Sequence, residues 1–320
     1  MKITLLDHLP AECDVLADAS TTATFYHTST WLHSLAKTLS GLTLRCLVAE
    51  DGGVFSGYLP FFFVRMGPLQ RAWSLPFGTY GGPVAAGNSA VIPMLLDEYR
   101  RATNRRDVIE TGWVDFHGIA PASAKRGTPG TTQIVDLSQG FDHVWDNLFA
   151  RDKRKRARKA TRDGVTVERC SDASGVDSHY GIYSERVSSF GTQEAFPVSL
   201  FEELFTRGGD RVRLFLAWHQ GHVVGSHFNF YHKDAVVAWY GMASAAGDNV
   251  QAGTLLYTDC IRDACTDGFT SYNLGASLGR QSLIDYKESL GGATYTYDTH
   301  IRRTVLGRFG ATVRRLRRRG

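Results

Sequence analysis

The segment Val212–Met242 reads VRLFLAWHQGHVVGSHFNFYHKDAVVAWYGM and contains three strand patterns in succession. Each pattern is rich in β-branched and aromatic residues, and only a Gln-Gly and a Lys-Asp dipeptide separate them. Such short polar turns between strand-forming runs predict an antiparallel meander. Alternation along the middle strand sends its phenylalanines to one face, which we expect to be core, and His227, Asn229 and Tyr231 to the other.

A helix is expected directly after this meander. The sequence Asn249–Leu256 reads NVQAGTLL, and apolar residues then recur at helical spacing up to Gly268. The helix should begin near Gly253. Because the first N–H groups of a helix lack internal partners, this turn is either a site for a phosphate or carbonyl group or an ordinary connection between strand and helix.

Length and composition indicate a globular protein with room for two domains. The chain has 320 residues, is 43% hydrophobic and carries a net charge of +4. No apolar run is long enough to span a bilayer, and the N-terminus lacks the pattern of an export signal. Five scattered cysteines lack metal-ligand or disulfide spacing, so we expect reduced core cysteines and no metal.

The element pattern predicts an α/β fold with mixed sheets in two successive domains. Residues 1–137 form the first, residues 138–302 the second, and residues 303–320 a basic tail that is either an amphipathic helix or disordered. Both halves have the order helix, strand, strand, helix, strand, which is compatible with a duplicated fold, although no strict sequence repeat is present.

Five motifs, in this order, resemble the FemAB-like family, in which two GNAT-like domains are fused. They are SLPFGTYGGP at 74–83, the basic helix before Gly164, RVSSFGTQ at 186–193, NVQAGTLL at 249–256 and YNLGASLGRQSLIDYKESLGG at 272–292. The resemblance covers nearly the whole chain. It implies two tandem GNAT-like domains and an acyltransferase.

The same resemblance implies the class of reaction. Members of the family move an amino acid from aminoacyl-tRNA to an amine of a cell-wall precursor, and relatives are assigned acyl transfer in polysaccharide or natural-product pathways. We therefore expect aminoacyl-tRNA as co-substrate, with no bound cofactor. Acyl-CoA is the alternative donor, and a non-catalytic GNAT-like protein at the membrane surface is the second alternative.

Four residues are candidates for the chemistry. In the family, a lysine in the motif matched by Tyr286-Lys287 faces the site where the acyl group and the phosphates meet, although a solvated lysine is the alternative. Tyr286 either hydrogen-bonds the substrate or packs. Asn273 either holds the donor or caps the end of its strand. His227 is either a general base or a structural histidine, with Asp285 and Glu288 as weaker candidate bases.

Phosphate-binding candidates come from two kinds of segment. The turn before the second-domain helix supplies the donor-binding candidates Gln251, Gly253, Thr254 and Leu255. A continuous helix is predicted over 141–162, with an apolar face that becomes a basic one, and its Arg151, Arg154 and Arg158 are candidates for an anionic acceptor or other phosphates. A merely solvated helix is the alternative.

Tyr80 is a further candidate for binding the acceptor or its phosphates. Tyr80 lies in the glycine-rich loop at 74–83, whose backbone can approach a ligand closely. We expect a cytoplasmic protein without DNA as a partner. The charge of the basic tail suits three alternative roles: peripheral contact with anionic lipid, binding of RNA phosphates, or keeping the protein in solution.

Overall fold

The meander predicted at Val212–Met242 is present in the computed structural model. Its strands are β9 (Val212–His219), β10 (His222–His232) and β11 (Ala235–Ala243), paired antiparallel. The first turn has positive φ at both Gln220 and Gly221 (50° and 78°), the backbone that a tight two-residue hairpin requires. The structure describes residues 1–85, 87, 90–121, 127–189, 195–277 and 279–308.

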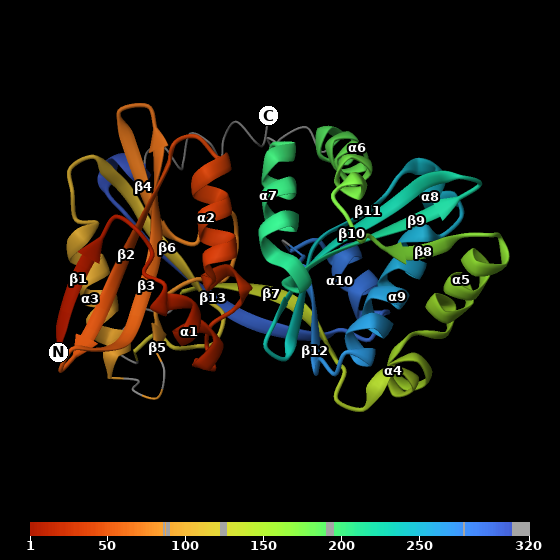
Figure 1. Ribbon diagram of the computed structural model, residues 1–320, viewed down its shortest axis with the longest axis horizontal. Coiled ribbons are helices and arrows are strands. Elements are labelled where there is room, and N and C mark those ends of the chain that lie inside the picture. The colour runs from red at the N-terminus through yellow and green to blue at the C-terminus, as the bar shows by residue number, and fades with distance from the viewer. Residues whose placement is uncertain (86, 88–89, 122–126, 190–194, 278, 309–320) are drawn as a thin grey trace. The chain divides into compact units, whose positions relative to one another are not determined.

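The chain divides into two units, coloured along the sequence in Figure 1. Unit 1 comprises Met1–Gly130 together with the chain from Thr296 onward, and unit 2 comprises Thr131–Tyr295. The sequence-based boundary after residue 302 therefore differs from this division. The reason is that β13 (Ala293–Arg303) pairs from Asp298 onward with β6 (Val108–Asp115) of unit 1.

Unit 1 has a mixed sheet of strand order β1-β2-β3-β4-β6-β13, with β5 paired to β3. All its adjacent strands are antiparallel except β4 and β6, which are parallel. Its other elements, in chain order, are β1 (Lys2–Leu6), α1 (Glu12–Ala19), a 3-10 turn (Phe25–His27), α2 (Ser29–Thr38), β2 (Leu42–Asp51), β3 (Val54–Met66), β4 (Leu69–Ser74), β5 (Val84–Ala85) and α3 (Val91–Ala102).

Unit 2 has a sheet of strand order β7-β12-β11-β10-β9-β8, in which only β11 and β12 are parallel. Its other elements are β7 (Thr128–Asp136), α4 (Gly140–His143), a π-helical turn (Val144–Leu148), α5 (Arg151–Arg162), β8 (Thr166–Arg169), α6 (Ser174–Ser189), α7 (Val198–Gly208), a 3-10 turn (Gly209–Arg211), α8 (Ala245–Asn249), α9 (Ala252–Thr266), β12 (Ser271–Ala276) and α10 (Gln281–Glu288).

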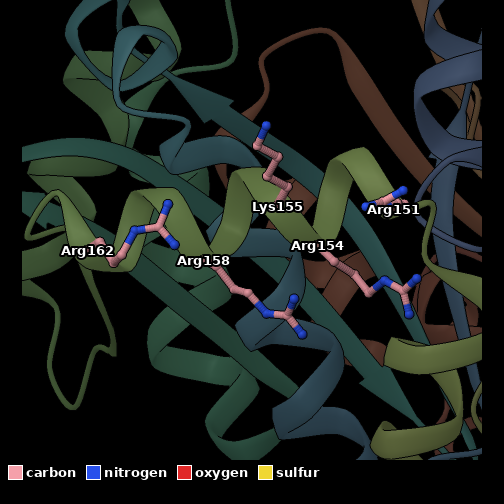
Figure 2. A pocket seen from close by; sticks show the side chains of 5 residues that line it. All are labelled: Arg151, Arg154, Lys155, Arg158 and Arg162. Carbon is pink, nitrogen blue, oxygen red and sulfur yellow. The ribbon is translucent and has the colours of Figure 1, made fainter.

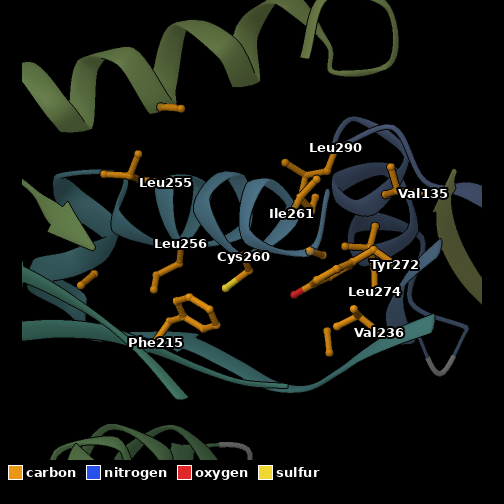
Figure 3. Packing of buried hydrophobic residues seen from close by; sticks show 14 of the residues in the cluster. Val135, Phe215, Val236, Leu255, Leu256, Cys260, Ile261, Tyr272, Leu274 and Leu290 are labelled. Atoms are coloured by element: carbon orange, nitrogen blue, oxygen red, sulfur yellow. The ribbon is translucent and has the colours of Figure 1, made fainter. Parts of the chain in front are cut away.

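Helix α9 covers one face of the unit 2 sheet. Leu256 and Cys260 extend from it towards the sheet and join a buried cluster that also contains Phe215 and Tyr272 (Figure 3). The opposite face of β10 carries the predicted phenylalanine core, and Phe228 is fully buried there. Burying both faces of β10 in this way is expected to fix its register, because a one-residue slip would exchange the two sets of side chains.

The prediction of one continuous helix over 141–162 is wrong. The chain leaves helical geometry at Phe149 (ψ 130°) and Ala150 (ψ 145°), so α5 begins anew at Arg151. Phe149 is buried in the core, and the backbone N–H of Ala150 donates to the carbonyl of Ser289 at 2.9 Å. These two tertiary contacts offset the loss of continuous helical hydrogen bonds. The apolar and basic faces therefore belong to different helices.

Candidate active site

Two neighbouring parallel strands separate at the candidate site. Pairing of β11 with β12 is limited to Ala235–Val237 and Ser271–Asn273, although β11 continues to Ala243. An extra residue, Trp239, is accommodated in β11, because Asn229 pairs with Ala238 and the preceding Phe228 pairs with Tyr240. Such bulges bend a strand and end its pairing, which leaves backbone groups available to a ligand.

Asn273 is the last residue of β12 that pairs with β11. Its Oδ1 accepts hydrogen bonds from Thr132 Oγ1 at 2.6 Å and from the backbone N–H of Gly275 at 2.9 Å. Gly275 has φ +78°, a value that favours glycine and lets the chain turn out of the sheet. The side chain therefore makes the capping contact that was one of its two predicted roles, and its role in holding a donor stays a prediction.

Lys287 reaches this strand end from α10. The side chain is 3% exposed, and Nζ donates to the carbonyl oxygens of Gly275 at 2.5 Å and Ala276 at 3.1 Å. Burial, with a smaller contribution from the positive charge of Arg280, lowers the pKa of Lys287 to about 8. An ammonium group has three N–H donors, so one remains for a ligand after these two bonds.

His227 lies on β10, on the sheet face covered by α9. Its ring is 1% exposed, packs edge-on against Tyr257 with ring centroids 4.5 Å apart, and hydrogen-bonds through Nδ1 to Asn229 Oδ1 at 2.8 Å. Burial lowers its pKa to about 4, the bond to Asn229 opposes this shift, and the charge of Lys287 adds to it. The imidazole is therefore neutral at pH 7 and lies close enough to Lys287 to respond to its charge.

Tyr286 connects α10 to the first turn of α9. Burial raises the pKa of its hydroxyl, and a hydrogen bond with Thr254 opposes that rise. Lys153 Nζ of α5 lies 4.4 Å from the Tyr286 ring centroid, a cation–π distance. Tyr286 thus both packs and hydrogen-bonds, and its partner Thr254 is one of the candidate residues from the predicted donor turn.

The beginning of α9 has the geometry of an anion site. Gln251 adopts φ +61° and its Oε1 accepts from Arg156 at 3.2 Å. Among the residues that the structure describes, the amides of Ala252 and Gly253 have no acceptor. Leu255 is 6% exposed and belongs to the core, so only its backbone is near this turn.

The predicted arginines form an elongated basic surface on α5. Arg151, Arg154, Lys155, Arg158 and Arg162 line a pocket of about 510 Å³, and these five are called the α5 basic face below (Figure 2). Arg154 and Arg158 extend to the same side of the helix in Figure 2. Arg154 is anchored on the carbonyls of Trp145 and Asp146 at 3.2 and 2.6 Å, and the Arg158 guanidinium lies 5.4 Å from the Trp145 ring centroid.

Most of these cations have no acidic neighbour. Arg154 has Asp146 at 3.6 Å, whereas Arg151, Lys155, Arg158 and Arg162 have no ion-pair partner in the described part of the chain. Exposed cations that are not neutralised locally attract anions. The face therefore has the charge expected of a phosphate-binding surface.

Tyr80 lies in unit 1 and is 4% exposed. Its ring stacks on Phe116 with centroids 4.1 Å apart and meets Tyr26 and Tyr297 edge-on at 5.8 and 5.6 Å. In this setting the ring packs among other aromatic rings, and its predicted part in acceptor binding stays a prediction.

Unit 2 thus brings together most of the predicted residues and adds some that sequence reasoning missed. Tyr272 lies within the motif at 272–292 without a predicted role, and its hydroxyl donates to Asn229 Oδ1 at 2.7 Å. Thr132 and Lys153 were also missed. The sequence signal for these three is weak, because their contacts join segments far apart in the chain. No cluster of three or more metal-binding side chains occurs among the described residues.

The arrangement suits acyl transfer. An ammonium donor beside backbone carbonyls can stabilise a developing oxyanion, and a neutral imidazole can accept a proton. Residues 148–288 match the family model described as "Acetyltransferase (GNAT) domain". This part of the chain is a GNAT domain. A search of curated proteins found no match.

Solved structures show that the chain has a fold similar to that of FemX and of a tandem GNAT protein. The chain superposes on FemX with a TM-score of 0.69 at 14% identity, covering 93% of this chain and 97% of that one. It superposes on the C-terminal domain of a putative lysylphosphatidylglycerol synthetase from Agrobacterium fabrum with a TM-score of 0.63 at 13% identity, covering 93% of this chain and 95% of that one. It superposes on a tandem GNAT protein from the clavulanic acid biosynthesis pathway with a TM-score of 0.56 at 12% identity, covering 94% of this chain and 98% of that one.

These matches confirm the predicted fold class and the resemblance to the FemAB-like family. GNAT enzymes join an activated acyl donor to an amine acceptor, and this coarse activity applies to the chain. In the described part of the chain, no helix is long and apolar enough to cross a membrane.

Proposed function

We propose that this GNAT protein transfers an aminoacyl group from aminoacyl-tRNA to an amine of a cell-wall, polysaccharide or natural-product acceptor. The observation that carries the choice of donor is the length of the α5 basic face. Arg151 and Arg162 are the ends of a helix with a rise of about 1.5 Å per residue, so the face is about 16 Å long.

That length favours a nucleic acid over a single pyrophosphate. One strand of a duplex presents a phosphate for about every 3.4 Å of its axis, so about five phosphates fit along the face. Coenzyme A has its charge concentrated at one end of the molecule. Arginine side chains that fork from one helix are suited to contacting successive phosphates.

The chemistry is assigned to the buried end of β12. The ester carbonyl of the donor would lie beside Lys287, whose remaining N–H stabilises the oxyanion of the tetrahedral intermediate. The first-turn amides at Gly253 and the hydroxyl of Thr254 would orient the donor's terminal nucleotide. Asn273 and Tyr286 would hold the ends of β12 and α10 in place around it.

A family resemblance and one structural neighbour support aminoacyl transfer. The FemAB-like resemblance implies aminoacyl-tRNA as donor, and the Agrobacterium neighbour is the C-terminal domain of a putative lysylphosphatidylglycerol synthetase. An anionic acceptor, lipid-linked or free, is part of the proposal. The basic tail lies outside the described residues from 309 onward, so its contact with lipid stays a prediction, as does a cytoplasmic location.

Acyl-CoA is the second candidate donor, and one observation favours it. The free amides of Ala252 and Gly253 at the start of α9 are suited to a pyrophosphate. GNAT enzymes use acyl-CoA as co-substrate. The two donors differ in their contact with the α5 basic face. A tRNA would contact most of this face, whereas a CoA molecule bound at α9 would leave most of it without a ligand.

The donor can be tested without knowing the acceptor. Purified protein is incubated with bulk tRNA charged with a labelled amino acid mixture, or with labelled acetyl-CoA, and protein-dependent loss of the ester or thioester is measured. Slow deacylation of aminoacyl-tRNA and none of acetyl-CoA is expected. Hydrolysis of acetyl-CoA alone would replace the proposed donor by the alternative.

A further inference from the structure

Asn229 is the centre of a buried hydrogen-bond network that joins three elements of unit 2. Its Oδ1 is contacted by His227 Nδ1 at 2.8 Å and by the Tyr272 hydroxyl at 2.7 Å, and its Nδ2 donates to Cys260 Sγ at 3.4 Å. Asn229 and Tyr272 are both fully buried. Polar groups enclosed in this way are stabilising only when their donors and acceptors match.

The network specifies where the proton of the imidazole is. An amide oxygen has lone pairs and no hydrogen, so both groups that contact Asn229 Oδ1 must donate to it. The Tyr272 hydroxyl donates one bond, and His227 donates the other from Nδ1–H. A neutral imidazole carries one proton only, so Nε2 holds a free lone pair.

Nε2 of His227 is buried and lies against Gly241, in the part of β11 that extends beyond its pairing with β12. It has no hydrogen-bond partner among the described residues, although the ring is 1% exposed. The residue beside it, across the strand pair, is Gly241, and a Cβ built there would lie 2.2 Å from Nε2. Gly241 itself is exposed. A side chain at this position would therefore collide with the imidazole, and the glycine lets Nε2 lie against the exposed Gly241 backbone, in the part of β11 that is not paired with β12.

We propose that Asn229 and Tyr272 are positioning residues that hold His227 as the Nδ1–H tautomer, so that Nε2 takes a proton from the attacking amine and passes it to the leaving oxygen. This inference rests on the proposed function. The amine nitrogen bonds to the ester carbonyl carbon, and the bond from that carbon to the ribose oxygen breaks. The proton removed from nitrogen ends on the ribose hydroxyl, so no other reactant is required.

The weak basicity of this histidine is compatible with that role. Its pKa of about 4 is far too low to deprotonate a free ammonium ion, but attack by a neutral amine makes the bound nitrogen positive and strongly acidic. The titratable groups around the ring are Lys287 of α10, Tyr257 of α9 and, from the other sheet face, His179 of α6, while Cys260 of α9 and Tyr272 of β12 contact its partner Asn229. Of these only Lys287 is charged near pH 7 in this site, and its charge adds to the burial that keeps the imidazole neutral.

Nitrogen NMR of the histidine rings tests the tautomer directly. In full-length protein labelled with ¹⁵N, long-range spectra at pH 7 should show His227 with Nδ1 protonated and Nε2 bare. Tyr272→Phe removes the hydroxyl that fixes the orientation of the Asn229 amide, so the amide can turn its NH₂ group towards Nδ1 and the Nε2–H form should increase. Tyr231→Phe on the same face, whose hydroxyl donates to Asp263, should leave the signal unchanged. A His227 signal with Nε2 protonated in the wild-type protein would overturn the proposal.

The pH profile of transfer adds a readout that a merely structural role would not move. Asn229→Asp places a carboxylate against Nδ1–H, which raises the pKa of His227, so the acidic limb of the profile should move upward by about one pH unit or more. An unmoved limb in a folded, active variant would overturn the proposal. If NMR shows the predicted tautomer but the protein transfers no group from either donor, the tautomer assignment is supported and the proposed function is overturned.

Discussion

The Nζ of Lys287 lies 2.5 Å from the carbonyl oxygen of Gly275, at the point where β12 has left its pairing with β11. A buried ammonium therefore closes the end of a strand that opens towards a ligand. The contact serves two purposes in this account. It anchors α10 to β12, and it holds a positive charge where the oxyanion would form.

The activity should fall as the pH rises through about 8, because the ammonium form of Lys287 is required. Its pKa is lowered from an ordinary value of 10.5 to about 8 by burial. A lowered pKa means that the folded state favours the neutral lysine, so its contribution to stability increases between pH 8 and 10.5. A pH–rate profile measured alongside thermal unfolding tests this prediction. Activity lost between pH 8 and 10.5 would not be due to unfolding caused by deprotonation of Lys287.

Gly253→Ala should weaken donor binding without harming the fold. A Cβ at this position would meet only Ala243 Cβ, at 3.9 Å, and alanine is preferred to glycine in helices, so the unfolding free energy should change by about 1 kcal/mol or less. The added methyl group would hinder approach to the first-turn amides. Gly181→Ala in α6, where a Cβ meets nothing within 4 Å, is the matched control. Equal donor affinity in both variants would argue against a donor site at α9.

Removing cations from the α5 basic face should weaken tRNA binding and its dependence on salt. For Arg151→Gln and Arg158→Gln, the slope of log K against log salt should decrease by about 1 for each phosphate that the variant no longer neutralises. Arg207→Gln on α7 is the control, because Arg207 is engaged by Glu203 at 2.7 Å and lies outside the face. Equal slopes for all three variants and the wild type would contradict the proposed binding of tRNA.

Arg213→Met should destabilise unit 2 through uncompensated carboxylates. Arg213 NH1 lies 2.6 Å from both Asp263 and Asp267, and its guanidinium lies 4.1 Å from the Tyr231 ring centroid. Breaking a buried pair costs about 3–5 kcal/mol, and about 3 is expected because Asp267 is 42% exposed. Chemical denaturation measures the change, and a loss below about 1 kcal/mol would mean that solvent already screens these charges.

Local patterns were sufficient to predict the parts of the fold that depend on neighbours in sequence. The meander, its tight turns and the start of α9 follow from strand periodicity, turn residues and helical spacing. The break before α5 was not predictable in this way. It depends on Phe149 entering the core and on Ala150 binding the carbonyl of Ser289, which is far away in the chain.

The same limit applies to the site. Lys287 and His227 were found through a family motif and strand alternation, yet the partners that define their chemistry come from other segments. The bond from Tyr272 to Asn229 depends on which strands are adjacent, and the pairing of β13 with β6 depends on where the chain returns. Side-chain period shows the face on which a residue lies, and only the tertiary structure shows what it meets there.

Single-turnover reaction of labelled aminoacyl-tRNA with wild-type protein and Lys287→Met tests the central claim most directly. Methionine keeps the length and apolar character of the side chain but has no N–H, and Lys159→Met on α5 is a matched control. We predict a loss of about 10²–10³ in the rate for Lys287→Met with its fold intact by circular dichroism, and an unchanged rate for Lys159→Met. A wild-type rate in folded Lys287→Met protein would contradict the account.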